Sequence, residues 1–213
     1  MTKKSKSSRQ WLQRQRSDNY VKRAVADGYR SRAAYKLIEL NDRDKFLRPG
    51  MTIVDLGAAP GGWSQVAVEI AGIGNVIAVD LLPIDPINGV DIILGDFNAE
   101  QVHADVIKRL GNRPVDLVIS DMAPNFSGIR AVDLPRAVYL AEIACAFALE
   151  VLAPGGGLLV KLFQGEGFTE YLTALRSTFA SVVIRKPKAS RAESSEVYVL
   201  ARKFKKKEMV PLE

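Results

Sequence analysis

Two polar residues in otherwise apolar surroundings are the best candidates for chemistry. Lys161 lies inside the run GLLVKLF at residues 157–163, and Asp121 directly follows the apolar run VDLVIS at residues 115–120. A lysine in a central strand must reach a cleft or lose its charge. If the two runs form neighbouring strands, their ends bring the ammonium group and the carboxylate together. Such a pair could orient a hydroxyl group or take its proton.

Chemistry that depends on thiols, imidazole pairs or bound metals is disfavoured by the composition. The chain has one cysteine, Cys145, and one histidine, His103. A single cysteine excludes an internal disulfide and a CxxC metal site. Cys145 lies in an apolar helical run, where a small buried hydrophobe is expected rather than a nucleophile. We therefore predict no metal site.

A glycine-rich segment, DLGAAPGGW at Asp55–Trp63, has the composition of a cofactor loop. Small residues let a ligand approach the backbone, and the helix that follows offers free amides. The GxGxxG spacing of dinucleotide sites is missing, and a simple tight turn remains an alternative. Acidic residues follow the next apolar runs. Asp80 could accept hydrogen bonds from ribose hydroxyls. Asp96 and Phe97 could bind the amino group and the ring of an adenine, although Asp96 could instead cap a helix. With Asp121, these strand ends together predict a nucleoside cofactor.

The order of predicted elements indicates how these residues are positioned. Short apolar runs alternate with helical stretches, which is typical of a doubly wound α/β fold with a parallel sheet covered on both faces. The last two strand-like runs, 180–185 and 196–201, have no helix between them and predict an antiparallel pair at the end of the sheet. The earlier runs are residues 51–56, 75–80, 90–94, 115–120 and 157–163, and the helical stretches are residues 18–27, 31–41, 62–71, 99–110, 134–152 and 167–177.

The net charge of +6 is unevenly distributed along the chain. Residues 1–48 carry 14 Lys and Arg against 5 Asp and Glu, residues 49–184 carry 7 against 15, and residues 185–213 carry 9 against 4. Basic ends around an acidic body suggest a polyanion partner, although terminal lysines can also serve solubility alone. Four aromatic rings lie among the N-terminal charges and could stack on bases or belong to the core: Trp11, Tyr20, Tyr29 and Tyr35.

Neither a membrane span nor a secretory signal is indicated. No run approaches the roughly 18 uncharged apolar residues that a membrane helix requires. The basic N-terminus is not followed by an apolar segment of the kind that signal peptides contain. We therefore expect a cytoplasmic protein, with a monomer as the default state.

Four motifs resemble those of the FtsJ/RrmJ family of ribosomal RNA 2′-O-ribose methyltransferases. These are DLGAAPGGW, SDMAPN, VKLFQGEG and SSEVYVL, and the resemblance extends from about Trp11 to Arg202. It implies a Rossmann-like S-adenosylmethionine-dependent methyltransferase fold, with a seven-stranded, mostly parallel sheet whose last strand is antiparallel. It also implies methylation of a uridine 2′-hydroxyl in large-subunit, 23S-type ribosomal RNA. The tail KFKKKEMVPLE is longer and more basic than the resemblance leads us to expect.

The resemblance also implies site residues and a division of the chain. The catalytic set would be Lys36, Asp121, Lys161 and Glu196, and the residues that contact S-adenosylmethionine would be Gly57, Gly61, Trp63, Asp80, Asp96 and Asp121. We expect a basic, partly disordered RNA-binding segment at residues 1–30, a methyltransferase domain at 31–202 and a basic tail at 203–213.

The predicted reaction explains why two lysines and two acids would be needed. A ribose hydroxyl is a poor nucleophile at neutral pH, and an ordinary lysine has a pKa near ~10.4. Burial and the second ammonium group of Lys36 would lower the pKa of Lys161, whereas Asp121 would oppose them. Lys161 is then the base, or the group that orients the hydroxyl, while Lys36 and Glu196 fix the ribose. Lys36 could instead be a phosphate contact, and Glu196 a surface acid.

Three other functions remain open from the sequence. A non-catalytic ribosome-assembly or RNA-binding factor could keep the same fold, although the intact catalytic set counts against it. A NAD-dependent dehydrogenase is disfavoured by the missing glycine motif. A relative that acts on tRNA or mRNA caps would share the catalytic set. The sequence also leaves open whether naked ribosomal RNA or an assembled subunit is the substrate.

Overall fold

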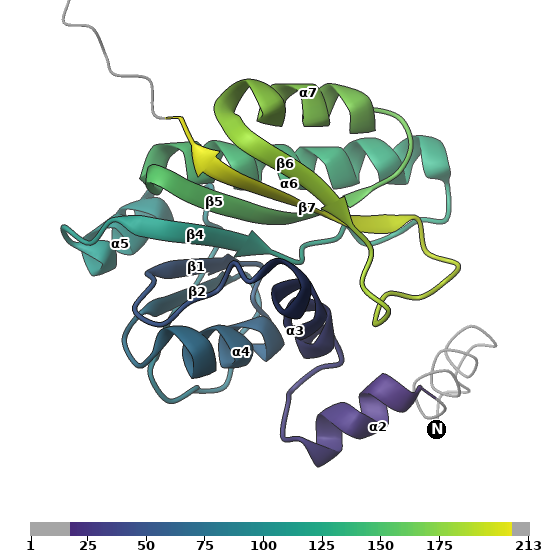
Figure 1. Ribbon diagram of the computed structural model, residues 1–213. Helices are drawn as coiled ribbons and strands as arrows, with labels where there is room; N and C mark the ends of the chain where they lie inside the picture. The colour runs from purple at the N-terminus through teal and green to yellow at the C-terminus, as the bar shows by residue number, and fades with distance from the viewer. Residues whose placement is uncertain (1–17, 206–213) are drawn as a thin grey trace, which may run out of the picture.

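The computed structural model describes residues 18–205, which form one α/β sandwich (Figure 1). Residues 1–17 of the expected RNA-binding segment, Trp11 among them, and most of the basic tail lie outside the described residues. The helices are α2 (Asn19–Ala26), α3 (Ala33–Asp44), α4 (Gly62–Ala71), α5 (Glu100–Leu110), α6 (Arg130–Val151) and α7 (Phe168–Thr178). The strands are β1 (Ile53–Leu56), β2 (Val76–Asp80), β3 (Val90–Leu94), β4 (Val115–Ser120), β5 (Leu152–Phe163), β6 (Phe179–Arg185) and β7 (Glu196–Phe204).

The seven strands form a single sheet in the order β3-β2-β1-β4-β5-β7-β6. Strands β1 to β5 are parallel, and β7 lies antiparallel between β5 and β6. This confirms the predicted seven-stranded sheet with an antiparallel last strand. Strand order reverses between β1 and β4, so the carboxyl ends of these two strands border the crevice in which ligands of such sheets bind.

Both faces of the sheet are apolar, and helices cover each of them. Helices α3 and α4 pack on one face, and α5, α6 and α7 pack on the other (Figure 1). The inner strands β1, β4 and β5 are almost completely buried along their carboxyl-terminal halves, as expected for parallel strands between two helical layers. The sheet is therefore a rigid support for the loops at its carboxyl edge.

Two elements begin earlier than the sequence predicts. Helix α6 was expected from residue 134, just before Pro135, but it begins at Arg130. Strand β5 was expected from residue 157, but it begins at Leu152, and its register with β4 shifts around Gly157. In both cases a helix or sheet continues past a proline or glycine segment because tertiary contacts outweigh local preference.

The described part of the N-terminal segment packs onto the rest of the fold. The rings of Tyr20 and Tyr29 contact the ring of Tyr35, with centroids 5.6 and 5.8 Å apart, and Tyr35 is buried. Asp18 caps α2 and pairs with Arg32. Of the interleaved aromatic residues, Tyr35 thus belongs to the core, whereas Tyr20 and Tyr29 stay half-buried at the surface.

Within residues 18–205, no helix is both long and apolar enough to cross a bilayer. The thiol of Cys145 lies half-buried on α6. Burial, partly offset by a hydrogen bond to Tyr171, raises the pKa of this thiol to about 11. Little thiolate is present at neutral pH, which agrees with the packing role expected from the sequence.

Candidate active site

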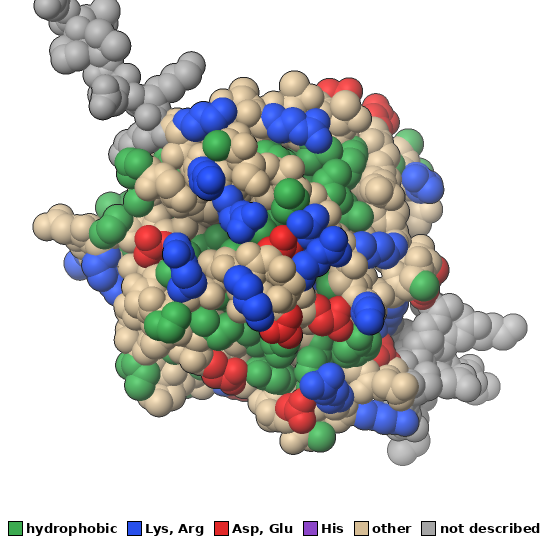
Figure 2. Space-filling model, in the orientation of Figure 1, with side chains coloured by type: hydrophobic (Ala, Val, Ile, Leu, Met, Phe, Trp, Pro, Cys, Tyr) green, Lys and Arg blue, Asp and Glu red, His purple; other side chains and the backbone are tan. Residues whose placement is uncertain are grey.

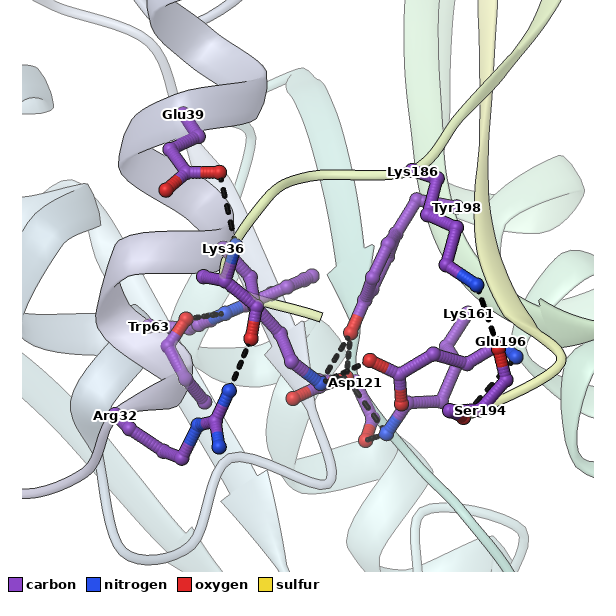
Figure 3. Close-up of polar contacts among 12 residues, drawn as sticks. Arg32, Lys36, Glu39, Trp63, Asp121, Lys161, Lys186, Ser194, Glu196 and Tyr198 are labelled. Carbon is purple, nitrogen blue, oxygen red and sulfur yellow. Dashed lines mark hydrogen bonds and ion pairs between the residues drawn. The ribbon is translucent and has the colours of Figure 1, made fainter. Parts of the chain in front are cut away.

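Four residues that the sequence singles out converge at the carboxyl edge of the sheet, although they come from four separate elements. Lys36 projects from the first turn of α3, Asp121 follows β4, Lys161 lies near the end of β5, and Glu196 begins β7 (Figure 3). The strand register explains the convergence, because Ser120 pairs with the residue before Lys161. Lys36, Lys161 and Glu196 are at most 9% exposed, and Asp121 is half-buried, so little of the cluster is open to solvent.

The charges in this cluster are paired closely. Lys161 Nζ lies 2.7 Å from Asp121 Oδ1 and donates a second hydrogen bond of 2.9 Å to the Asp121 backbone carbonyl. Lys36 Nζ lies 2.8 Å from Glu196 Oε1 and 3.9 Å from Asp121 Oδ1. An ammonium group has three N–H donors. Asp121 accepts two of those of Lys161, which leaves one direction for a further partner.

A fifth residue, Tyr198, joins the two ion pairs and was not assigned from the sequence. Its hydroxyl accepts a hydrogen bond of 2.9 Å from Lys36 Nζ and donates one of 2.5 Å to Asp121 Oδ1 (Figure 3). The signal was present, because Tyr198 follows Glu196 by two positions on a strand and therefore points to the same face. In register, it lies directly beside Lys161.

The electrostatics of the cluster keep both acids ionised. Burial would raise the pKa of Asp121, but the ammonium groups of Lys161 and Lys36 outweigh it and hold that pKa below its usual range. Burial opposes ionisation of Glu196 as well, and Lys36 holds its pKa below the usual value. Burial and the neighbouring carboxylates raise the pKa of Tyr198, so this phenol stays protonated and can donate to Asp121.

Two cavities meet at this cluster. The larger of the two, of about 450 Å³, is lined by Lys36, Lys161 and Glu196. The other, of about 170 Å³, is lined by the glycine-rich loop and by Asp121. Asp121 thus borders the second cavity, while its partner Lys161 borders the first. A separate cavity of about 610 Å³ lies at the opposite edge of the sheet, beside Gly155, and none of the residues of the cluster lines it.

The glycine-rich loop has the backbone geometry of a ligand cradle. Gly57 and Gly61 have φ angles of +71° and +106°, a region that residues with a side chain rarely adopt. A Cβ at Gly57 would lie 2.2 Å from Met122 Cγ, and one at Gly61 would lie 2.6 Å from Ile87 Cδ1. Both positions therefore require glycine, because a side chain would strain the backbone and collide with a neighbouring residue.

Asp80 is the last residue of β2, and Asp96 lies two residues beyond the end of β3. Asp80 already accepts hydrogen bonds of 2.8 Å from the amides of Ala59 and Leu82, one on each carboxylate oxygen. Each oxygen keeps a second lone pair, so a ribose could still bind. Asp96 is exposed and accepts a hydrogen bond from the amide of Asn98, two residues further on. It does not cap α5, because the N-cap of that helix is Ala99.

One expectation at this edge is wrong. Phe97 was expected to lie beside an adenine ring, but it is buried in the core, where its ring contacts that of Phe147 in a T-shaped arrangement. Adenine would therefore have to pack on other groups. The carboxylate of Asp96 is exposed and could still accept a hydrogen bond from the amino group of an adenine.

Trp63 lies in the interior of the protein, between the glycine-rich loop and α3. Its side chain is buried, its indole Nε1 donates a hydrogen bond of 2.7 Å to the Ala33 carbonyl, and its ring lies 5.6 Å from that of Tyr198. It also lines the smaller cavity together with Ala33. Trp63 thereby connects the glycine-rich loop with α3 and with the charged cluster.

The donor set suits S-adenosylmethionine. This cofactor carries a ribose diol, an adenine amino group and a positively charged sulfur. The smaller cavity is bordered by carboxylates and by small residues, and no basic side chain lines it. Among residues 18–205, no group of three or more His, Cys, Asp or Glu side chains is arranged as a metal site.

Comparison with known proteins agrees with this geometry. Residues 29–204 match the FtsJ-like methyltransferase family. A ribosomal RNA large subunit methyltransferase E from Cellvibrio japonicus is 56% identical over 202 residues, which cover 94% of this chain and 96% of the relative. A protein of the same name from Methylobacillus flagellatus is 57% identical over 202 residues, covering 94% and 98%.

A solved structure supports the same assignment. The crystal structure of a protein described as a ribosomal RNA methyltransferase from Plasmodium falciparum matches with a TM-score of 0.74 and 30% identity. The match covers 83% of this chain and 98% of that one. The chain therefore belongs to the FtsJ-like methyltransferase family and is an S-adenosylmethionine-dependent enzyme.

Proposed function

We propose that this enzyme transfers a methyl group to the 2′-hydroxyl of a uridine in large-subunit, 23S-type ribosomal RNA. It would act in the cytoplasm, as a monomer, and support maturation of the large subunit. The observation that carries the proposal is the position of the charged cluster between two cavities, with Asp121 on one side and Lys36, Lys161 and Glu196 on the other. Family membership removes the dehydrogenase alternative. The names of the two bacterial relatives support ribosomal RNA as the substrate.

The residues divide naturally between cofactor and substrate. Gly57, Gly61, Trp63, Asp80 and Asp96 would hold S-adenosylmethionine, which supplies an electrophilic methyl group when bound. The glycines admit the ligand to the backbone, and the carboxylates of Asp80 and Asp96 accept hydrogen bonds from its hydroxyl and amino groups. Asp121 would complete this side.

The remaining groups would prepare the ribose hydroxyl. Lys161, in its neutral form, would accept the proton of the hydroxyl at Nζ. Asp121 fixes Lys161 by the two contacts described above, which leave one direction of Nζ toward the larger cavity. Lys36 and Glu196, paired at 2.8 Å, would hold the ribose in line. The proton lost by the hydroxyl thus ends on Lys161, and no metal takes part.

The basic surface around the larger cavity supports RNA as the partner. Lys and Arg side chains are numerous on the face shown in Figure 2. Arg32 and Arg191 line the cavity of about 450 Å³ that Lys161 borders, and Arg43, Lys186 and Lys188 line a separate cavity of about 550 Å³. We propose that residues 1–30 and this surface together neutralise phosphates of the substrate.

The test is transfer of labelled methyl groups to total RNA, to unmethylated large subunits and to whole ribosomes, followed by mapping of the product. A 2′-O-methyl nucleotide in large-subunit RNA is expected, and Lys161→Ala should abolish it without loss of S-adenosylmethionine binding. Arg109→Ala, at a surface ion pair remote from the cluster, is the control. No transfer to any RNA would favour the non-catalytic assembly factor, and transfer to tRNA would refute the substrate.

A further inference from the structure

Phe126 is an exposed aromatic residue at the mouth of the larger cavity. It is 54% exposed, and it lines the cavity together with Lys36 and Lys161. Its ring meets that of Phe163 edge-to-face, with centroids 5.2 Å apart and an interplanar angle of 74°. Phe163 is the last residue of β5 and is buried, so it provides a fixed support for the exposed ring.

The loop that carries Phe126 is tied down on its other side by a buried carboxylate. Asp133, in the first turn of α6, is 5% exposed. It accepts hydrogen bonds of 2.8 Å from both the amide and the hydroxyl of Ser127, and one of 2.9 Å from the amide of Gly128. These residues directly follow Phe126. The exposed ring of Phe126 is therefore held by Phe163 on one side, and its loop is held by Asp133 on the other. Such support is unexpected for an exposed aromatic side chain that binds no ligand.

The walls of the cavity differ in chemistry. Phe126 and Phe163 form an apolar wall, whereas Arg191, Glu193 and Ser194, from the connection between β6 and β7, supply hydrogen-bond donors and acceptors. A nucleobase has an apolar face and a polar edge. Its face would fit the aromatic wall, and its edge would fit the polar one.

The position of Lys161 requires such a subsite. Because Lys161 is only 8% exposed, the ribose of the target nucleotide must enter the cavity to bring its hydroxyl to Nζ. A nucleotide that enters so deeply leaves its helical stack, and its base loses its stacking partners. Aromatic side chains commonly replace them.

We propose that Phe126, supported by Phe163, is the stacking platform for the base of the target nucleotide. The proposal rests on the proposed function, since it assumes that a ribose is bound beside Lys161. It adds a nucleobase subsite to the cofactor and ribose sites. Phe126 positions the substrate and takes no part in proton or methyl transfer.

Steady-state kinetics with unmethylated large ribosomal subunits test the subsite. At saturating S-adenosylmethionine, Phe126→Ala should lower kcat/KM by about 10- to 100-fold, the range that loss of one base–aromatic stack predicts. Phe126→Tyr keeps the ring and should stay within about threefold of the wild type. Tyr139→Ala is the matched control, because Tyr139 is 59% exposed and lies outside the cavity. Affinity for S-adenosylmethionine and thermal stability should be equal in all four proteins.

Three results would overturn the subsite: an unchanged kcat/KM in Phe126→Ala, an equal loss in Tyr139→Ala, or a tyrosine variant as poor as the alanine variant. A loss of stability or of cofactor affinity in Phe126→Ala would show a purely structural role and would also refute it. Mapping the product separates the two proposals. If the wild type methylates a ribose and Phe126→Ala is unaffected, the subsite alone is wrong. If the methyl group is mapped elsewhere, the proposed function fails as well.

Discussion

Replacing Asp55 by asparagine should change how the stability of the enzyme depends on pH. Asp55 is 1% exposed at the end of β1, beside the cofactor loop, and its Oδ2 accepts a hydrogen bond of 2.6 Å from Ser64 Oγ. Burial raises the pKa of Asp55 to about 7, against the lowering effect of Ser64, and the charges of Asp121 and Asp80 raise it further. The folded protein therefore binds a proton here that the unfolded chain releases near pH 4.

The sign and size follow from proton linkage. A group whose pKa is raised by folding contributes stability that is complete below its unfolded pKa and is lost as pH rises through the folded value. With pKa values of ~3.9 unfolded and about 7 folded, the wild type should lose roughly 2–3 kcal/mol between pH ~5 and ~8.5 that the asparagine variant retains. Asparagine resembles the protonated acid and can still accept the hydrogen bond from Ser64. The other titrating groups are the same in both proteins, so their contributions cancel when the two free energies of unfolding are compared.

Urea unfolding of both proteins at several pH values measures this difference. The two free energies of unfolding should diverge with rising pH and become parallel above about pH 8. Ser64→Ala serves as a second probe. It removes a hydrogen bond to the ionised carboxylate, so the divergence should extend to higher pH. Curves that stay parallel throughout, or that diverge in the opposite direction, would show that Asp55 is ionised in the folded protein and that the reasoning is wrong.

Four further changes test the two sites and the basic segment. Lys161→Arg should be nearly as inactive as Lys161→Ala, because a guanidinium group with a pKa above ~12 cannot accept the proton. Single-turnover rates measure this, and substantial activity of the arginine variant would exclude Lys161 as the base. Asp80→Ala should weaken S-adenosylmethionine binding by at least about tenfold, since hydrogen bonds worth roughly 0.5–1.5 kcal/mol each are lost, and calorimetry with an unchanged affinity would remove Asp80 from the site. Residues 1–17 carry six Lys and Arg and no Asp or Glu, so their deletion should weaken RNA binding and reduce its salt dependence while leaving cofactor affinity intact. If the RNA affinity of the truncated protein falls with salt concentration as steeply as that of the full chain, this prediction is wrong. Gly57→Ala should lower both thermal stability and cofactor affinity, because its Cβ would lie 2.2 Å from Met122 Cγ at a φ of +71°, and a variant as stable as the wild type would show that the loop adapts.

Much of the fold could be predicted because its signals are local. Parallel strands buried on both faces are continuous apolar runs, and the absence of a helix between residues 185 and 196 indicated the antiparallel pair. The errors lie where tertiary contacts decide. Strand β5 continues back to Leu152 because it pairs with Val115 across a glycine segment. Helix α6 extends beyond Pro135 toward a loop that Asp133 holds.

The candidate site was predicted unevenly, for a physical reason. Each residue of the charged cluster lies within a short motif, so family resemblance could locate it. Tyr198 escaped notice because its importance comes from two hydrogen bonds across the sheet, to Lys36 and Asp121. Whether Phe97 faced the cofactor or the core likewise depended on the packing of Phe147 from a distant helix. Contacts between segments remote in sequence leave no local pattern.

The place of β7 in the sheet has a consequence for biosynthesis. Among residues 18–205 this strand, Glu196–Phe204, is synthesised after the other six, yet it is inserted between β5 and β6 and supplies Glu196 and Tyr198. The bond from Lys36 to Tyr198 spans 162 positions, so the cluster closes only after nearly all of the described chain has been synthesised. Until then β5 and β6 lack the strand that joins them, and Lys36 lacks both partners. A nascent chain can thus form its cofactor loop early, but it completes the charged cluster only after β7 has been synthesised.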